Sequence, residues 1–216
     1  MESDLAVMPF WKRLFDIAGA LALALPLLPV VGFTALVILA LDGRPVFYVS
    51  ERMTTAARGF ALWKFRTMRP DAADSGVSGG DKAARITRTG AFLRRSRLDE
   101  VPQLWNILKG DMSFVGPRPP LRRYVEDYPK LYGKVLQSRP GVTGLATMIY
   151  HRHETQLLEP CQTAEQTDAL YRRACVPRKA RLDLIYQSRQ SLCLDIWILF
   201  RTVFHKKTGK PPSSAG

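Results

Sequence analysis

The sequence predicts an α+β fold that is mainly helical, with an N-terminal membrane segment, a short β-hairpin and amphipathic helices. Residues 17–41 carry no charged side chain, two short β-rich runs lie between residues 46 and 65, and later segments repeat apolar residues at helical spacing. With 216 residues, 46% of them hydrophobic, the chain suffices for one folded domain with a core. The predicted parts are a tail at 1–11, the membrane segment at 12–41, the main domain at 42–205 and a flexible tail at 206–216.

The net charge of +13 favours anionic partners, which include nucleic acids, anionic lipid headgroups and phosphorylated substrates. No nucleic-acid-binding motif accompanies this charge, so no nucleic-acid partner is expected. Cys161, Cys175 and Cys193 are scattered and odd in number, which argues against a disulfide framework or a zinc site. His151 and His153 lack a second ligand cluster and are not expected to bind metal.

The apolar segment from Ile17 to Leu41 exceeds the roughly 20 residues that a membrane span requires. Pro26 and Pro29 interrupt it, and an interior proline removes a helical hydrogen bond. The halves on either side of the break before Pro29 would be about 18 and 20 Å long. Neither half alone crosses a hydrocarbon core of about 30 Å.

Two topologies are consistent with this segment. A proline-kinked span would place the N-terminus and the main domain on opposite sides of the membrane, whereas a re-entrant helix-break-helix would keep both on one side. Basic residues flank both ends, which favours the re-entrant form with both ends in the cytoplasm. They are Lys12 and Arg13 before the segment, and Arg44, Arg52 and Arg58 after it.

The main domain is expected to begin with a hairpin formed by residues 46–49 and 60–65, followed by a flexible loop at 71–81. Helices are predicted for residues 91–108, ending at Gly110, and for 121–137. Residues 181–204 have an apolar face and predict one further helix. That face suits either the membrane surface or a protein core, and the sequence leaves both open.

Asp99 and Glu100 are adjacent carboxylates that follow a run of arginines. Side chains at i and i+1 of a helix point about 100° apart, so these two suit different tasks, such as nucleophilic attack and cation binding. Pro102 indicates that a helix begins there, and its positive end would favour bound phosphate. Alternatively, Ser96 and Asp99 fit a helix-capping box.

Two further groups of basic residues are candidate phosphate ligands. Arg118 lies between Pro117 and Pro119, whose fixed φ angles would hold it ready to bind a diphosphate through two hydrogen bonds. Lys64 and Arg66 alternate on a predicted strand, which would place both cations on one face. In each case a solvated surface residue is the alternative.

These motifs resemble those of the bacterial monotopic phosphoglycosyl transferases, also called the bacterial sugar transferase family, in its small single-domain form. The matching segments, in the family's order, are Lys12–Asp16, Lys64–Met68, Arg85–Gly90, Leu98–Asn106, Lys109–Pro119 and Pro140–Gly144.

The resemblance implies a re-entrant membrane helix broken at Pro29, with Pro26 close by, and a small catalytic domain on the cytoplasmic face of the bacterial inner membrane. It implies transfer of a sugar-1-phosphate from a UDP-sugar to polyprenyl (undecaprenyl) phosphate with release of UMP. This is the first membrane step of glycoconjugate synthesis, which makes downstream glycosyltransferases candidate partners.

The resemblance also implies roles for single residues. Asp99 would be the nucleophile that forms a covalent phosphosugar intermediate, and Glu100, together with Asp99, would ligate Mg²⁺. The substrate-binding candidates are Arg118, Pro117, Pro119, Lys64, Arg66 and Arg88. Mg²⁺ and nearby arginines would keep the pKa of Asp99 low.

The sequence departs from the family's pattern at three places. Leu28 replaces a common serine before the helix-breaking proline, and Ser50-Glu51-Arg52 stands where Gln-x-Arg is common before the second strand. Residues 145–152 replace a common stretch with tryptophan and Gly-Arg, so the family's usual sugars do not transfer to this chain.

Two other functions compete with this one. A membrane-associated glycosyltransferase would release UDP, and a non-enzymatic basic anchor protein would bind lipid or nucleic acid without needing Asp99 or Mg²⁺.

Overall fold

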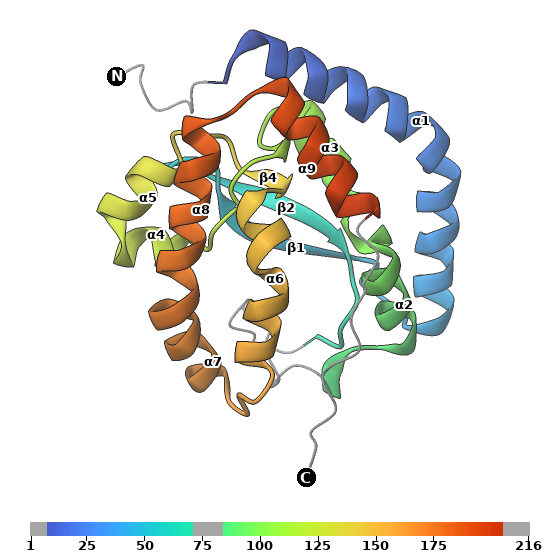
Figure 1. The fold of residues 1–216 in the computed structure, drawn as a ribbon. Coiled ribbons are helices and arrows are strands. Elements are labelled where there is room, and N and C mark those ends of the chain that lie inside the picture. The colour runs from blue at the N-terminus through green and yellow to red at the C-terminus, as the bar shows by residue number, and fades with distance from the viewer. Residues whose placement is uncertain (1–7, 71–83, 205–216) are drawn as a thin grey trace.

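The computed structural model describes residues 8–70 and 84–204 (Figure 1). The predicted flexible loop at 71–81, the predicted tail at 206–216 and residues 1–7 of the predicted tail at 1–11 lie outside the described residues, so these predictions stay untested there. The elements in chain order are α1 (Phe10–Leu41), β1 (Phe47–Met53), β2 (Gly59–Phe65), α2 (Arg88–Ser96), the 3-10 turn η2 (Leu98–Glu100), α3 (Gln103–Lys109), β3 (Ser113–Val115), α4 (Arg122–Asp127), α5 (Pro129–Val135), β4 (Gly141–Thr143), α6 (Leu145–Leu158), α7 (Ala164–Leu170), the π-helical turn η3 (Tyr171–Cys175), α8 (Val176–Ser188) and α9 (Leu192–Phe204).

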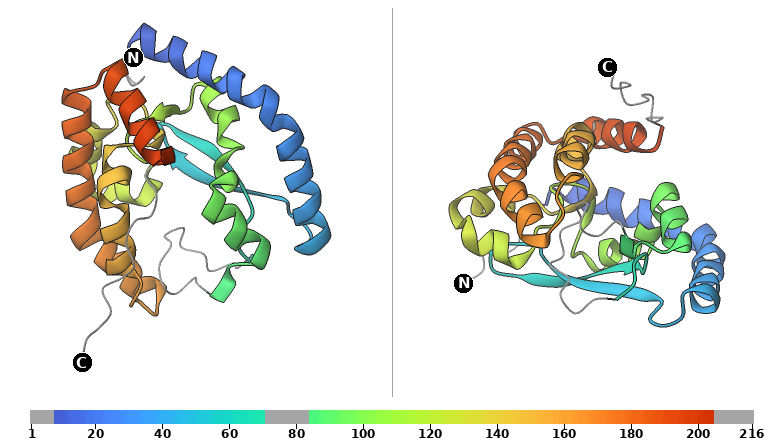
Figure 2. Two further views of the ribbon diagram at one scale, coloured as in Figure 1. Left: turned by 45° about the vertical axis from the view of Figure 1, so that its right-hand side comes forward. Right: turned by 90° about the horizontal axis from the view of Figure 1, so that it is seen from below.

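Helix α1 stays helical through both Pro26 and Pro29, so the predicted interruption of the helix is absent. It bends instead, and Figures 1 and 2 show it curving around one side of the molecule. Prolines cause such bends because each frees one backbone carbonyl and crowds the preceding turn. By length and composition α1 could cross a membrane, with a mean hydropathy of 2.4 in its most apolar window.

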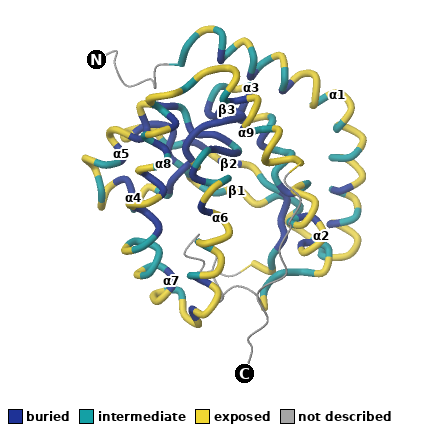
Figure 3. Tube along the Cα trace, in the orientation of Figure 1, coloured by how far each residue is buried: buried dark blue, intermediate teal, exposed yellow. Residues whose placement is uncertain are grey.

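The two ends of α1 pack on the same folded domain. Lys12, Asp16 and Ala20, spaced by one helical turn, are buried near its start, and Thr34 and Ile38 are buried near its end. Between residues 21 and 33 no side chain is buried, and Figure 3 shows the exposed outer side of the helix. The middle of α1 therefore has little contact with the rest of the protein.

The predicted hairpin is confirmed, with strand β1 longer than expected. β1 and β2 pair antiparallel, with Phe47 opposite Phe65 and Met53 opposite Gly59. The apolar side chains Phe60 and Leu62 of β2 enter the main core together with Ile107 and Val115, and Ala20 of α1 joins the same cluster. Helices α1 and α3 thus pack against the hairpin through this shared core.

A second, parallel pair joins β3 and β4, which border the proline-rich loop. The two backbones approach so closely that a Cβ at Gly116 would lie 2.2 Å from the carbonyl oxygen of Arg139, and one at Gly144 would lie 2.1 Å from that of Gly116. Only glycine fits at such a distance. The amide of Gly116 donates to Thr143 at 2.9 Å, and that of Gly141 donates to Pro117 at 2.8 Å. These contacts fix the backbone that carries Arg118.

The helix predicted for 91–108 is divided. Arg97 has a φ of +61°, in the left-handed region, and it ends α2 and starts η2. A non-glycine residue there costs roughly 1 kcal/mol or more, and such strain clusters at functional sites. Helix α3 then ends at Gly110, as predicted, with a φ of +93°.

The single helix predicted for 181–204 is wrong as well, because the chain breaks after Ser188 and begins again at Leu192. Asp195 of α9 is fully buried and bonds Lys12 of α1 at 2.5 Å. Tyr186 of α8 donates to the other oxygen of Asp195 at 2.6 Å and lies 3.2 Å from the carbonyl oxygen of Val115. This buried network joins α1, α8, α9 and β3.

Candidate active site

The turn η2 places Asp99 and Glu100 between the left-handed Arg97 and helix α3. Pro102 is the N-cap of α3, in agreement with its predicted position at the start of a helix. The alternative of a capping box is not formed, because the Ser96 hydroxyl donates back to the carbonyl oxygens of Phe92 and Leu93. The two carboxylates are therefore free for another role.

Glu100 lies among three cations. Its Oε1 is 3.0 Å from the Lys64 ammonium and 3.6 Å from the Arg118 guanidinium, and its Oε2 is 3.8 Å from Arg97. Burial alone would raise the pKa of Glu100, but Lys64, Arg118 and Arg97 outweigh it and lower the pKa to about 2. Glu100 is therefore ionised at any physiological pH. Two of the predicted phosphate ligands, Lys64 and Arg118, lie together beside it.

Asp99 has a different environment, although it is the next residue. Its side chain is 9% exposed, and its Oδ1 has no hydrogen-bond partner among the described residues. Burial and the charge of Glu100 raise the pKa of Asp99, against the attraction of Lys64, Arg94 and Arg97. Mg²⁺ and nearby arginines had been expected to keep the pKa of Asp99 low. The arginines alone do not lower it below its ordinary value. A buried, unpartnered carboxylate oxygen favours a ligand at this position.

Arg118 projects from an otherwise buried segment. Within the described stretch 111–120 it is the single exposed residue, and Pro117 and Pro119 on either side of it are buried. Its side chain is 41% exposed. This geometry agrees with the predicted rigid presentation of an arginine between two prolines, and it leaves the guanidinium accessible to an anion.

Two predicted phosphate ligands lie elsewhere. The Arg66 guanidinium donates to the carbonyl oxygens of Asp42 and Gly43, both at 2.7 Å, and so holds the turn that follows α1. Arg66 comes just after β2 ends, so strand alternation does not place it beside Lys64. Arg88 is exposed at the first position of α2, and no contact in the described structure joins it to Asp99 or Glu100.

The structure adds basic residues that were not among the predicted site residues. Arg94 and Arg97 act on Asp99, and Arg94 is held by a 2.8 Å bond from its Nε to the Thr67 hydroxyl. Arg52 of β1 lies close enough that Arg118, after burial, lowers its pKa. Arg94 and Arg97 belong to the arginine run before Asp99, so the sequence contained a signal for them, whereas nothing local pointed to Arg52.

Among the described residues there is no group of three or more His, Cys, Asp or Glu side chains that could hold a metal ion. Mg²⁺ does not need such a group, because it is usually bound by one or two carboxylates and substrate phosphates. The free Oδ1 of Asp99 beside the ionised Glu100 fits that arrangement.

The site thus combines two adjacent carboxylates with Lys64, Arg97 and Arg118 around Glu100, in a chain whose first helix is long and apolar enough to cross a membrane. Residues 7–208 match the family model described as bacterial sugar transferase, and the chain belongs to this family.

The chain is similar to several bacterial proteins. It is 37% identical over 210 residues to the exopolysaccharide production protein PSS of Rhizobium leguminosarum bv. phaseoli, covering 91% of this chain and 95% of that protein. It is 32% identical over 210 residues to the UDP-N-acetylgalactosamine-undecaprenyl-phosphate N-acetylgalactosaminephosphotransferase of Aeromonas hydrophila, covering 94% of this chain and 45% of that protein. It is 34% identical over 197 residues to the UDP-glucose:undecaprenyl-phosphate glucose-1-phosphate transferase of Escherichia coli (strain K12), covering 89% of this chain and 39% of that protein. The chain thus spans less than half the length of the last two relatives.

Proposed function

We propose that this protein is a phosphoglycosyl transferase that moves a sugar-1-phosphate from a UDP-sugar to a polyprenyl phosphate such as undecaprenyl phosphate, releasing UMP. Its family and the names of its relatives support this proposal. The observation that carries it is the contrast between two adjacent carboxylates. Asp99 has an unpartnered oxygen, while Glu100 is surrounded by Lys64, Arg118 and Arg97.

In the first step, a carboxylate oxygen of Asp99 attacks the β-phosphorus of the UDP-sugar. The bond between the β-phosphorus and the bridging oxygen breaks, its electron pair stays on that oxygen, and UMP leaves. Arg118 and Lys64 bind the diphosphate oxygens and stabilise the charge that develops on them. The raised pKa of Asp99 agrees with a carboxylate that is weakly solvated and reactive.

In the second step, a phosphate oxygen of the acceptor attacks the same phosphorus and releases the Asp99 carboxylate. The product is a polyprenyl diphosphate sugar, and the enzyme returns to its starting state. Glu100, held ionised by its cationic neighbours, is positioned beside the reacting phosphate throughout.

Mg²⁺ bound by Asp99 and Glu100 would neutralise phosphate charge and would favour the ionised form of Asp99. The cations now on Glu100 are then free to turn to the substrate, because an incoming diphosphate offers Arg118 and Lys64 more negative charge than one carboxylate does.

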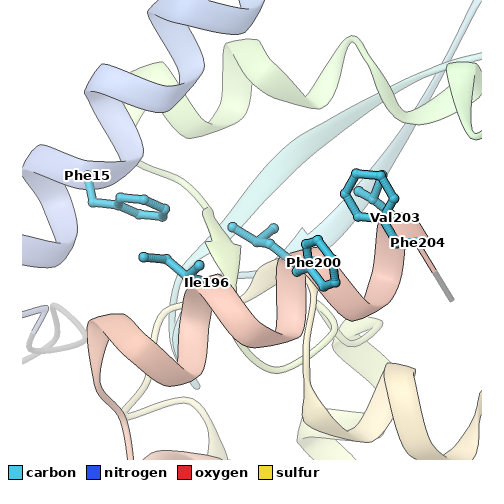
Figure 4. Close-up of a pocket in the computed structure, with 6 residues that line it drawn as sticks. Phe15, Ile196, Phe200, Val203 and Phe204 are labelled. Atoms are coloured by element: carbon cyan, nitrogen blue, oxygen red, sulfur yellow. The ribbon is translucent and has the colours of Figure 1, made fainter.

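We place the main domain at the cytoplasmic face of the inner membrane, with α1 entering and leaving the bilayer on the same side. Both ends of α1 pack on one domain, which supports a topology in which they lie on the same side of the membrane. Exposed apolar residues of α9 continue this surface, and Figure 4 shows Phe15 of α1 near Ile196, with Phe200, Val203 and Phe204 further along α9. Trp197 is 47% exposed beside them, as suits a membrane interface.

The topology can be tested with single cysteines at positions 10 and 41 in a variant that lacks the natural cysteines. A membrane-impermeant maleimide added outside intact spheroplasts should label neither position. Labelling of position 10 would instead demonstrate a span.

The reaction is tested by nucleotide release from the purified protein in nanodiscs, given Mg²⁺, undecaprenyl phosphate and a panel of UDP-sugars. UMP should be released from one or a few donors, and Asp99→Asn should reduce this release by roughly a thousandfold or more. The matched control, Glu126→Gln, alters an exposed carboxylate of α4 and should retain activity. Release of UDP would assign the chain to glycosyltransferases, and equal activity of Asp99→Asn would contradict the covalent mechanism.

A further inference from the structure

A polar cluster on α6, η3 and α8 has no part in the reaction steps above. The Lys179 ammonium donates to both carboxylate oxygens of Glu154, at 2.9 and 3.0 Å, and also lies 3.3 Å from the Tyr171 hydroxyl. The side chains of Lys179 and Glu154 are 9% and 18% exposed. The Glu154 carboxylate therefore remains partly accessible to a ligand, unlike a carboxylate in an ion pair enclosed in the core.

The cluster lies close enough to Arg118 for the charge of Glu154 to affect that arginine. The Tyr171 ring packs 5.2 Å from the ring of Tyr124, in the helix that follows the Arg118 loop. Burial lowers the pKa of Arg118, but nearby negative charges raise it. Glu100 has the largest raising effect, and Glu154 has the next largest. Glu154 therefore shares the electrostatic environment of the diphosphate-binding arginine.

The chemistry of the cluster suits neutral hydroxyl groups. A free carboxylate beside Arg118 would repel a diphosphate, but Lys179 neutralises Glu154 locally. Each carboxylate oxygen can accept more than one hydrogen bond, so the exposed part of Glu154 retains accepting capacity. Burial raises the pKa of Tyr171, which keeps its phenol neutral and able to donate or accept. Tyr171 also begins a π-helical turn, a feature that often marks functional positions.

We propose that Glu154, Lys179 and Tyr171 form a binding site for hydroxyl groups of the donor sugar nucleotide, with Glu154 as the main acceptor. The inference rests on the proposed function, because it uses the diphosphate at Arg118 to place the donor. The hydroxyls belong either to the transferred sugar or to the ribose, which share this chemistry.

The test measures UMP release for UDP-glucose, UDP-galactose, UDP-N-acetylglucosamine and UDP-N-acetylgalactosamine at saturating undecaprenyl phosphate. Glu154→Gln is compared with the wild type and with Glu159→Gln, which changes an exposed carboxylate at the end of the same helix. We expect Glu154→Gln to lower kcat/KM by about tenfold through KM, with kcat changed by less than about twofold. Glu159→Gln should match the wild type.

The pattern across donors identifies the source of the hydroxyls. A sugar contact predicts that the loss differs between the donors that are epimers at C4, with inhibition by UMP unchanged. A ribose contact predicts an equal loss for all four donors together with weaker inhibition by UMP. Either pattern supports the inference.

Because Glu154→Gln leaves Lys179 partly buried without its carboxylate, the double variant Glu154→Gln/Lys179→Met serves as a second test. It should show a raised donor KM at a melting temperature close to that of the wild type. An unchanged donor KM and unchanged donor ranking in both variants, with or without a loss of stability, would overturn the inference and leave the proposed function intact. A wild type that releases no UMP from any donor would overturn the proposed function itself, and the inference with it.

Discussion

Two lysine–carboxylate pairs in this protein have similar contacts and opposite surroundings. Lys12 and Asp195 lie 2.5 Å apart with side chains 1% and 0% exposed, and Lys64 and Glu100 lie 3.0 Å apart with side chains 19% and 12% exposed. The first pair is completed by the neutral Tyr186, whereas the second has Arg118 and Arg97 as additional cations. A closed, balanced pair fixes helices to each other. A pair with surplus positive charge and an exposed arginine can receive an anion.

The largest expected effect comes from breaking the enclosed pair. Lys12→Met would leave the Asp195 carboxylate buried without a counter-charge, which should lower the free energy of unfolding by about 3–5 kcal/mol. Denaturant unfolding in detergent would measure this. Lys12→Met/Asp195→Leu should recover most of the loss, because it removes both charges together. A fully stable Lys12→Met would show that the pair does not hold α1.

Removing the exposed lysine should affect catalysis more than folding. In the proposed mechanism Lys64 binds developing phosphate charge, so Lys64→Met should lower the rate of UMP release by roughly a hundredfold. Its free energy of unfolding should change by less than half the loss in Lys12→Met, because Arg118 and Arg97 remain beside Glu100. The comparison would fail if the two lysine variants lost stability equally.

The acid sensitivity of Glu100 sharpens the contrast. Its pKa is lowered from an ordinary 4.5 to about 2 in the folded protein. A carboxylate of this kind stabilises the fold above its unfolded pKa and loses that contribution as the pH falls toward its folded pKa. Wild type should therefore exceed Glu100→Gln in stability by on the order of 2 kcal/mol at neutral pH, with the difference disappearing between about pH 4.5 and 2. Unfolding curves across that range would measure it, and a pH-independent difference would contradict it.

The smallest expected effect has the opposite sign. Burial and Glu100 raise the pKa of Asp99, so its ionised form costs stability above the folded pKa and costs nothing below the unfolded pKa. In the absence of Mg²⁺, Asp99→Asn should therefore be slightly more stable than the wild type at neutral pH, although the proposed mechanism predicts that it is inactive. A lower melting temperature for Asp99→Asn would show that Asp99 is a structural residue.

The parts of the site that the sequence predicted are those that lie close together along the chain. The adjacent carboxylates, the prolines around Arg118 and the hairpin all depend on local geometry, and the structure has them as expected. Arg66 was misplaced because strand alternation was extended one residue past the end of β2, where its guanidinium turns to backbone carbonyls.

The remaining features depend on contacts between residues that are far apart in the sequence. Hydrophobic periodicity carries no information about such contacts. Nothing near Lys12 indicates that its partner is Asp195, which lies 183 residues away. No helix was predicted for residues 145–158, yet they form α6 and bring Glu154 to Lys179. The break between α8 and α9 was hidden because apolar residues continue at helical spacing on both sides of it.

The curved helix α1 is attached to the folded domain at both of its ends and not along its middle. A free transmembrane helix adapts to a thinner bilayer by tilting, but a helix fixed at Lys12 and again at Ile38 has lost that freedom. If α1 enters the bilayer from one side, as proposed, the lipid would have to adapt to the protein, and the distance between the two attachments would set how deeply the molecule is inserted. In the proposed arrangement, the shape of the chain would then also fix the height of Asp99 above the bilayer and its distance from a lipid-borne phosphate.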